Sequence, residues 1–165
     1  MPRPQRVRSI ETDYLLNMDA QDAQDNQDGK LLHAKLTRSI IGCAFEVINE
    51  LGCGFLESVY EKAMMIALAD TGLSVQSQKP VEVLFRGEPV GDFYADLLVE
   101  ERVVVELKSV KTLVPEHEAQ VINYLNATGI QVGLLINFGR PKLEFRRFTR
   151  SNRDTRDFRT PGAGK

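Results

Sequence analysis

Three charged side chains beside an apolar hairpin are the residues of this sequence whose types and spacing best suit chemistry. Two apolar runs, Leu97–Val99 and Val103–Val105, flank a charged corner of three residues, which predicts a β-hairpin. Side chains alternate along a strand, so Glu106 and Lys108 share one face. With a three-residue loop at the corner, Asp96 lies opposite Glu106 and joins them.

Two carboxylates and one ammonium group at this place suggest a metal site. Burying charge beside an apolar core is costly unless something compensates it. A divalent cation held by Asp96 and Glu106 would do so, because hard cations such as Mg²⁺ take oxygen ligands. The ammonium group of Lys108 could then act on a metal-bound water and on the charge that develops on a phosphate. The alternative is an exposed sheet face, with Asp96 solvated and Glu106 paired with Lys108.

Two helical segments carry further candidates. Glu57 and Tyr60 are one turn apart on a shared face, and Gln120 and Tyr124 are four residues apart, with His117 just before them. A Gln amide and a phenol can hydrogen-bond a phosphate, a base edge or a metal-bound water. Each segment also has a structural interpretation. Glu57 can be an acidic residue in the first turn of a helix, where the helix dipole favours it, beside a half-buried Tyr60. Gln120 and Tyr124 can be ordinary polar residues on a helix surface.

The elements that must position these residues follow from periodicity and from turn residues. The pattern predicts a helix from about 31 to 51, a helix over 56–71, strands over 81–85, 90–99 and 103–108, a helix over 115–128, and strands over 131–137 and 143–148. Two strands separated by a helix imply a right-handed crossover, so part of the sheet is expected to be parallel.

Composition sets the class of protein. The chain has 165 residues, enough for one domain with a proper core, with 42% apolar and 27% charged residues. No apolar run approaches the roughly 20 residues of a membrane helix, and the stretch at 1–8 lacks the apolar segment of a secretory signal. Cys43 and Cys53 suit a reducing cytoplasm as free thiols, and are too few for a metal site made of cysteine alone. We therefore expect a cytoplasmic protein without membrane contact.

Charge and complexity divide the chain into three parts. Residues 1–30, with six acidic and four basic side chains, are expected to form a disordered acidic tail, and residues 150–165 a second disordered tail. The domain between them spans 31–149. Residues 31–148 carry 12 basic and 15 acidic side chains, a net charge of −3. A domain of this charge does not bind nucleic acid by bulk electrostatics, so such a role would need a local basic groove or a metal.

The motifs together are similar to those of a known family. Asp96, the run Glu106-Leu107-Lys108, and the helix bearing Gln120 and Tyr124 resemble the PD-(D/E)xK nuclease superfamily, especially its RecB-like branch. Gly54-xx-Glu57-xx-Tyr60 and the motifs at 78–80, 117–120 and 133–139 resemble the GxxExxY protein family within it. The resemblance covers about 32–148. Cys53 stands where proline is expected in many relatives, and the acidic tail is an addition.

The resemblance implies an α/β fold of the restriction-endonuclease type, an αβββαβ core whose mixed central sheet is flanked by helices. It also implies that Asp96, Glu106 and the backbone carbonyl of Leu107 bind Mg²⁺ or Mn²⁺, with Glu57 as an additional ligand. Lys108 would then orient or activate the attacking water, and Gln120 and Tyr124 would position the scissile phosphate or brace the site.

The function implied is a metal-dependent nuclease that hydrolyses phosphodiester bonds with a metal-activated water, with DNA favoured over RNA. Nucleic acid is the expected partner, and the oligomeric state stays open, a homodimer included. The alternative is a non-cleaving nucleic-acid-binding or regulatory module that retains the fold, which the mildly acidic domain favours. A purely structural protein would leave the clustered charges unexplained.

Overall fold

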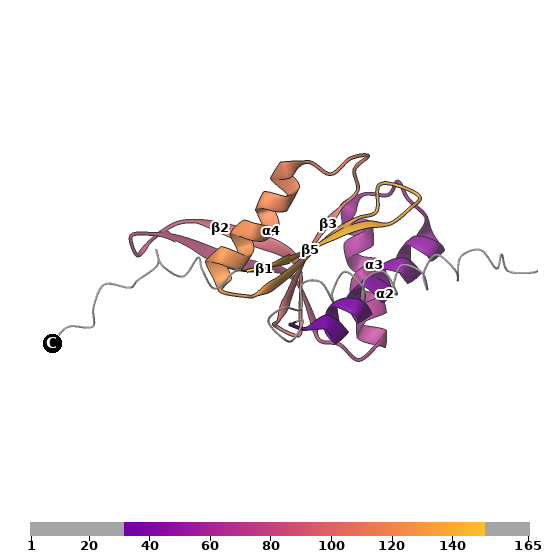
Figure 1. Cartoon of the computed structure of the whole chain (residues 1–165), viewed down its shortest axis with the longest axis horizontal. Coiled ribbons are helices and arrows are strands. Elements are labelled where there is room, and N and C mark those ends of the chain that lie inside the picture. The colour runs from indigo at the N-terminus through magenta and orange to yellow at the C-terminus, as the bar shows by residue number, and fades with distance from the viewer. Residues whose placement is uncertain (1–31, 151–165) are drawn as a thin grey trace, which may run out of the picture.

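One five-stranded sheet organises residues 32–150, the part of the chain that the computed structural model describes (Figure 1). The elements are α2 (Ala34–Leu51), α3 (Glu57–Asp70), β1 (Val75–Phe85), β2 (Glu88–Val99), β3 (Val103–Lys108), α4 (Pro115–Thr128), β4 (Val132–Asn137) and β5 (Glu144–Thr149). The predicted tails at 1–30 and 150–165 lie outside the described residues, except for Arg150.

The sheet is mixed, and its strands lie in chain order from β1 to β5. β1 pairs antiparallel with β2, β2 with β3 and β4 with β5, whereas β3 and β4 are parallel and are joined through α4. The predicted crossover between parallel strands is therefore confirmed. So is the predicted fold class, an α/β αβββαβ core with a mixed central sheet flanked by helices.

Helices cover the two faces of the sheet and create two apolar clusters. The larger lies beneath α2 and α3 and takes alternate residues of β3 such as Val103, Val105 and Leu107. The smaller lies beneath α4 and takes Val104 of the same strand. Because both faces are covered, β3 and β4 read as continuous apolar runs, which is typical of parallel strands. Glu106, in step with Val104, interrupts the run on the α4 side.

The hairpin between β2 and β3 has the predicted three-residue corner. Val99 pairs with Val103, and the two glutamates at the tip, Glu100 and Glu101, have positive φ angles of 52° and 54°. Ser74 ties the tip down, since its backbone N–H donates to Oε1 of Glu100 (2.6 Å) and its carbonyl accepts the N–H of Glu100 (2.9 Å). The register of the hairpin is thereby fixed.

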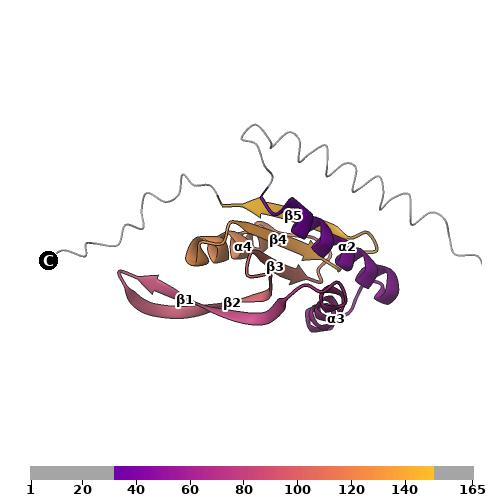
Figure 2. The ribbon, with the colours of Figure 1, turned by 90° about the horizontal axis from the view of Figure 1, so that it is seen from below.

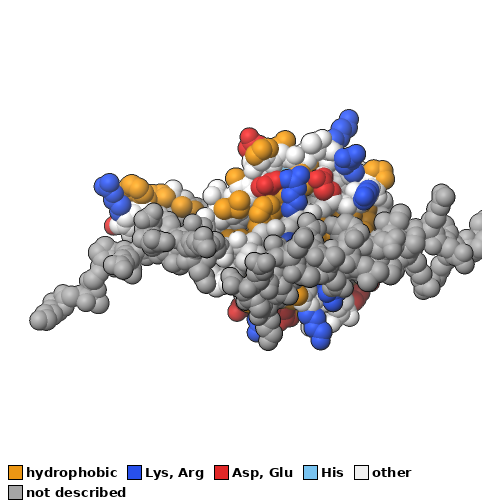
Figure 3. Space-filling view, viewed as in Figure 1, with side chains coloured by type: hydrophobic (Ala, Val, Ile, Leu, Met, Phe, Trp, Pro, Cys, Tyr) orange, Lys and Arg blue, Asp and Glu red, His pale blue; other side chains and the backbone are white. Residues whose placement is uncertain are grey.

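The first strand differs from its prediction. β1 begins at Val75 rather than at Val81, because Gln76, Ser77 and Lys79 pair with β2 through their backbones and carry no apolar pattern. The far part of the β1–β2 hairpin projects beyond the rest of the sheet as a two-stranded ribbon (Figures 1 and 2). Hydrophobic side chains are visible along this ribbon, and Phe85, at its tip, is 61% exposed (Figure 3).

The cysteines and the length of the helices can also be compared with the sequence analysis. Cys43 is buried and Cys53 exposed, and both are free thiols, as expected. Among the helices of residues 32–150, none is long and apolar enough to span a membrane.

Candidate active site

The candidate site forms where β2 and β3 stop pairing. Leu97 and Val105 are the last paired residues of the two strands, and the next positions along them are Asp96 and Glu106. There a side chain replaces the backbone as hydrogen-bond acceptor, because Oδ2 of Asp96 accepts the N–H of Leu107 at 2.8 Å. A side chain thus closes the opening between two diverging strands, and its carboxylate is fixed at the edge of that opening.

A kink in the β1–β2 ribbon directs Asp96. Leu97 packs in the cluster beneath α2 and α3, but Ala95, two residues earlier, packs in the cluster beneath α4. Regular alternation would place both on one face. Gln78, which faces Asp96 across the two strands, adopts the left-handed conformation with φ 49°. Such a local irregularity re-aims a side chain, and here it turns the strand at Asp96.

Gln78 also holds the second oxygen of Asp96. Its side-chain amide nitrogen donates to Oδ1 of Asp96 at 3.3 Å and to Oε2 of Glu61, on α3, at 2.8 Å. Both oxygens of Asp96 are therefore engaged, one by backbone and one by an amide that Glu61 orients. Sequence reasoning missed Gln78 and Glu61 as site residues, although Gln78 belongs to one of the motifs that carried the family resemblance.

Glu106 is a buried carboxylate in contact with one cation. Its side chain is 7% exposed and that of Lys108 is 11% exposed, with Nζ of Lys108 3.4 Å from Oε1 of Glu106. The structural alternative is therefore correct in pairing Glu106 with Lys108 and wrong in placing the pair on an exposed sheet face. Burial and then the negative charge of Asp96 raise the pKa of Glu106 to about 7, against the attraction of Lys108. One ammonium group leaves the two carboxylates only partly compensated.

Glu57 begins α3 on the side of the site. It is exposed, and its charge is near enough to Glu106 to contribute to the raised pKa of that carboxyl, as the smallest of the causes. The acidic position in the first helical turn agrees with the structural interpretation as well as with the functional one. An exposed glutamate at this place is free to turn toward Glu106 or toward solvent.

Tyr60 is a structural residue. It is fully buried, not half-buried, and its ring stacks on Phe138 with centroids 4.4 Å apart. Its hydroxyl donates to the carbonyl of Gly52 (2.7 Å) and accepts the N–H of Phe55 (3.2 Å). The tyrosine therefore fixes the loop between α2 and α3, which leads directly into Glu57.

The residues predicted on α4 have unequal environments. Tyr124 is 1% exposed, its ring lies 5.7 Å from that of Phe93, and burial raises its pKa. It is therefore not ordinary helix surface. Gln120 is half-buried, and its Oε1 is a buried oxygen with no hydrogen-bond partner within residues 32–150. In that part of the chain, no hydrogen bond joins either residue to Asp96, Glu106 or Lys108. His117 caps the helix, since its Nδ1 accepts the N–H of Val114 at 3.2 Å.

A buried asparagine fixes the segment after Lys108. Asn137 pairs with Lys108 between β4 and β3, and its side chain accepts the N–H groups of Val110 and Gly139 (both 3.0 Å) and donates to the carbonyl of Val110 (2.9 Å). A Cβ at Gly139 would lie 2.1 Å from the backbone oxygen of Val110. Sequence reasoning assigned no role to Asn137, although a polar residue ending an apolar run was a usable signal.

The donor set of the site fits a hard cation. Asp96 and Glu106 supply carboxylate oxygens. The pKa of Glu106 is raised first by burial and then by the charge of Asp96, and a bound cation would offset both effects. Within residues 32–150, no group of three or more His, Cys, Asp or Glu side chains is arranged to hold a metal ion. Two carboxylates would therefore need a backbone carbonyl, water or substrate oxygens to complete a coordination sphere.

Comparison with known proteins gives one family. The model of the family described as the PD-(D/E)XK nuclease superfamily matches residues 34–148. A crystal structure of the protein SSO0001 is similar, with 12% identity and a TM-score of 0.48 over 87% of this chain and 80% of that one. An alkaline exonuclease (LHK-Exo) from Laribacter hongkongensis has 15% identity and a TM-score of 0.44 over 76% of this chain and 75% of its own. No curated protein matches significantly in sequence.

Proposed function

The chain belongs to the PD-(D/E)XK nuclease superfamily, and on that premise we propose that it is a metal-dependent nuclease, hydrolysing phosphodiester bonds in nucleic acid. We place it in the GxxExxY family of the RecB-like branch because of its motifs. The expected substrate is DNA rather than RNA, and the expected compartment is the cytoplasm.

The observation that carries the proposal is the meeting of Asp96, Glu106 and Lys108 where β2 and β3 diverge. Glu106 is buried beside a second carboxylate, and Asp96 is held by hydrogen bonds to both of its oxygens. Such a constellation is unfavourable for stability unless it binds something positive. Strongly perturbed carboxyl groups of this kind occur preferentially at functional sites.

The ligands would be the side chains of Asp96 and Glu106 and the carbonyl of Leu107, with Glu57 as an additional acidic ligand. Mg²⁺ or Mn²⁺ bound there would supply an activated water and a positive charge at the phosphate. Leu107 is suited to this place because its N–H already binds Asp96, so its backbone lies at the divergence of the strands.

The remaining residues orient the reactants. The ammonium group of Lys108, 3.4 Å from Glu106, would orient the attacking water and stabilise negative charge on the phosphate. Gln120 would position the scissile phosphate by donating from its side-chain N–H groups, and its Oε1, which has no partner among the described residues, could accept from a metal-bound water. Tyr124, on the same helix, packs into the smaller apolar cluster and would hold α4 in place.

Cleavage by matched variants tests the proposal. With Mg²⁺ and a panel of DNA and RNA substrates, Glu106→Ala and Lys108→Ala should abolish cleavage while circular dichroism shows an intact fold. Glu101→Gln, an exposed glutamate in the corner before β3, is the control and should cut like the parent. Parent-like cleavage by Glu106→Ala or Lys108→Ala would refute the assignment.

A non-cleaving binding or regulatory module is the second candidate, and the net charge of −3 over residues 31–148 favours it. It predicts that the parent cuts no substrate of the panel and binds no Mn²⁺. Cleavage that depends on Glu106 would exclude it.

A further inference from the structure

A depression of about 590 Å³ lies beside the candidate active site. Its walls come from the loop before α3 and the start of α3, from the segment after β3, and from Gly139 after β4. They include Phe55, Leu56, Glu57, Ser58 and Lys111. The volume is within the range of pockets for small organic ligands, about 300–1,000 Å³. The depression is mixed in character, with apolar side chains on one wall and a cation on another.

The apolar wall is rigid and exposed. Phe55 is 48% exposed and Leu56 is 76% exposed. The backbone of Phe55 is held on both sides, by the hydroxyl of Tyr60 and by Ser109, whose Oγ donates to its carbonyl at 2.6 Å. Its ring packs edge-on against that of Tyr60, with centroids 6.2 Å apart, and leaves the rest of the ring accessible. A fixed, half-exposed aromatic ring is a surface on which a nucleobase can stack.

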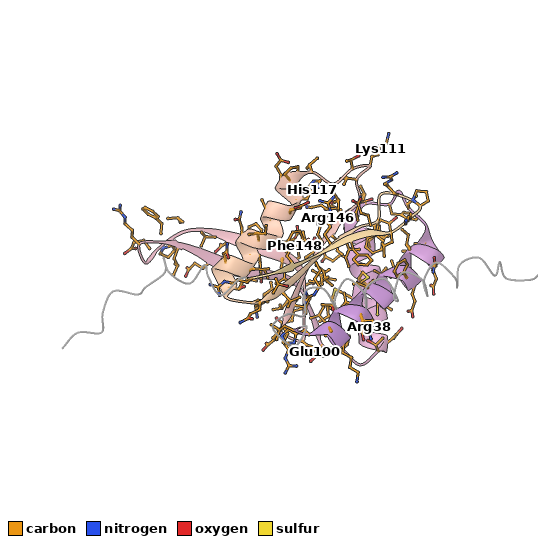
Figure 4. The ribbon with its side chains drawn as sticks, viewed as in Figure 1. Arg38, Glu100, Lys111, His117, Arg146 and Phe148 are labelled. Atoms are coloured by element: carbon orange, nitrogen blue, oxygen red, sulfur yellow. The ribbon has the colours of Figure 1, made fainter. Side chains whose placement is uncertain are left out.

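The polar wall carries one carboxylate, Glu57, and one cation, Lys111, and an anion would bind on the Lys111 side. Lys111 follows β3 and extends outward from the loop that leads to α4 (Figure 4). α3 begins at Glu57, and no side-chain cap among the described residues satisfies the N–H groups of its first turn. Backbone N–H groups at a helix start and a lysine ammonium both attract phosphate. Base-stacking and phosphate-binding features therefore face the same space.

The depression is next to the candidate active site. Glu57, a proposed ligand of the metal, is one of its lining residues. Ser109, another of its residues, directly follows Lys108 in the chain. A ligand in the depression would therefore lie close to a phosphate bound beside Lys108.

We propose that this depression binds one unpaired nucleotide next to the scissile phosphate, with its base against Phe55 and its phosphate near Lys111. A base paired and stacked within a duplex cannot enter such a pocket without being extruded, which is unfavourable. The substrate class is therefore single-stranded nucleic acid or the frayed end of a duplex. The inference rests on the proposed nuclease function and adds a preference to it.

Binding is tested with a single-stranded DNA ten-mer that carries one 2-aminopurine, whose fluorescence reports base stacking. The Glu106→Gln background prevents cleavage during the measurement. Phe55→Leu should weaken binding of the ten-mer roughly 5-fold to 150-fold, the range for loss of one base–aromatic stack. It should leave the salt dependence of binding unchanged. Lys111→Ala should lower the slope of log K against log salt by about 0.7, the value for one phosphate contact on a single strand.

Two control variants lie away from the depression. Phe85→Leu removes an exposed aromatic ring from the tip of the ribbon, and Arg102→Ala removes an exposed cation from the corner before β3. Both should bind the ten-mer like the background protein.

Cleavage by the parent chain distinguishes failure of the nucleotide pocket from failure of the nuclease function. A ten-mer should be cut faster than the same sequence within a closed hairpin duplex, and Phe55→Leu should reduce this preference. Equal cleavage of both substrates, or unchanged binding in Phe55→Leu and Lys111→Ala, would overturn the nucleotide pocket alone. A parent chain that neither binds nor cuts either substrate would overturn the nuclease function and this inference with it.

Discussion

Neutralising Glu106 should stabilise the metal-free protein at high pH. The substitution Glu106→Gln keeps nearly the same shape and removes the buried negative charge beside Asp96. Burial and the charge of Asp96 raise the pKa of Glu106 from 4.5 to about 7 in the folded protein, and this rise already includes the attraction of Lys108. The charged form of Glu106 is therefore disfavoured in the folded state.

The size of the effect follows from the two pKa values. The unfolded chain releases the proton near pH 4.5, whereas the folded protein keeps it until about pH 7. Stability from this group is therefore fully present below pH 4.5 and is lost as the pH rises through 7. The rise of about 2.5 in pKa, at about 1.4 kcal/mol each, corresponds to about 3 kcal/mol lost by pH 8. Glu106→Gln should recover an amount of this order at pH 8.

Thermal unfolding in EDTA, followed by circular dichroism at pH 5 and pH 8, measures this. The variant should melt roughly 6–12 °C above the parent at pH 8, with a much smaller difference at pH 5. Glu101→Gln, an exposed glutamate, serves as control and should match the parent at both values. A Glu106→Gln variant that gains nothing at pH 8 would refute the conclusion that the Glu106 carboxylate is unfavourably buried.

Three further substitutions test how the site is held. Asn137→Ala removes the buried partner of Val110 and Gly139 and should lower the free energy of unfolding by at least about 2 kcal/mol; urea denaturation checks this, and a parent-like midpoint would contradict it. Gly139→Ala places a Cβ against the Val110 backbone and should destabilise by about 1–3 kcal/mol or more in the same assay, so an unchanged midpoint would show that the two segments are not in close contact. Gln78→Asn tolerates the left-handed backbone but shortens the amide that holds Asp96, so Mn²⁺ affinity should fall about 10–100-fold in a calorimetric titration; parent-like affinity would exclude a positioning role.

Much of the fold was predictable because its central strands are fully buried. The apolar runs around Val103–Val105 and 132–136 identify β3 and β4, and the charged corner between Val99 and Val103 sets the register that brings Asp96 toward Glu106. Helix boundaries were also close, since Gly52 and Gly129 follow the two helices whose ends they mark. Local sequence signals were sufficient wherever periodicity and turn residues agreed.

Tertiary contacts account for what the sequence left open. The start of β1 is polar and becomes a strand because it pairs with β2. No local sequence pattern predicts this pairing. The left-handed conformation of Gln78 and its bridge from Glu61 to Asp96 depend on residues distant in the chain. The burial of Tyr60 depends on Phe138 in the same way. Pairing, kinks and bridges of this kind exist only once the sheet has formed.

The central claim is that Asp96 and Glu106 bind the same divalent cation. Calorimetric titration of the chain with Mn²⁺ tests it most directly, with Asp96→Asn and Glu106→Gln as variants and Glu101→Gln as control. Binding is expected in the parent and in the control, and the same binding event should be lost in each variant. Mn²⁺ binding of unchanged affinity and enthalpy in either variant would contradict the claim.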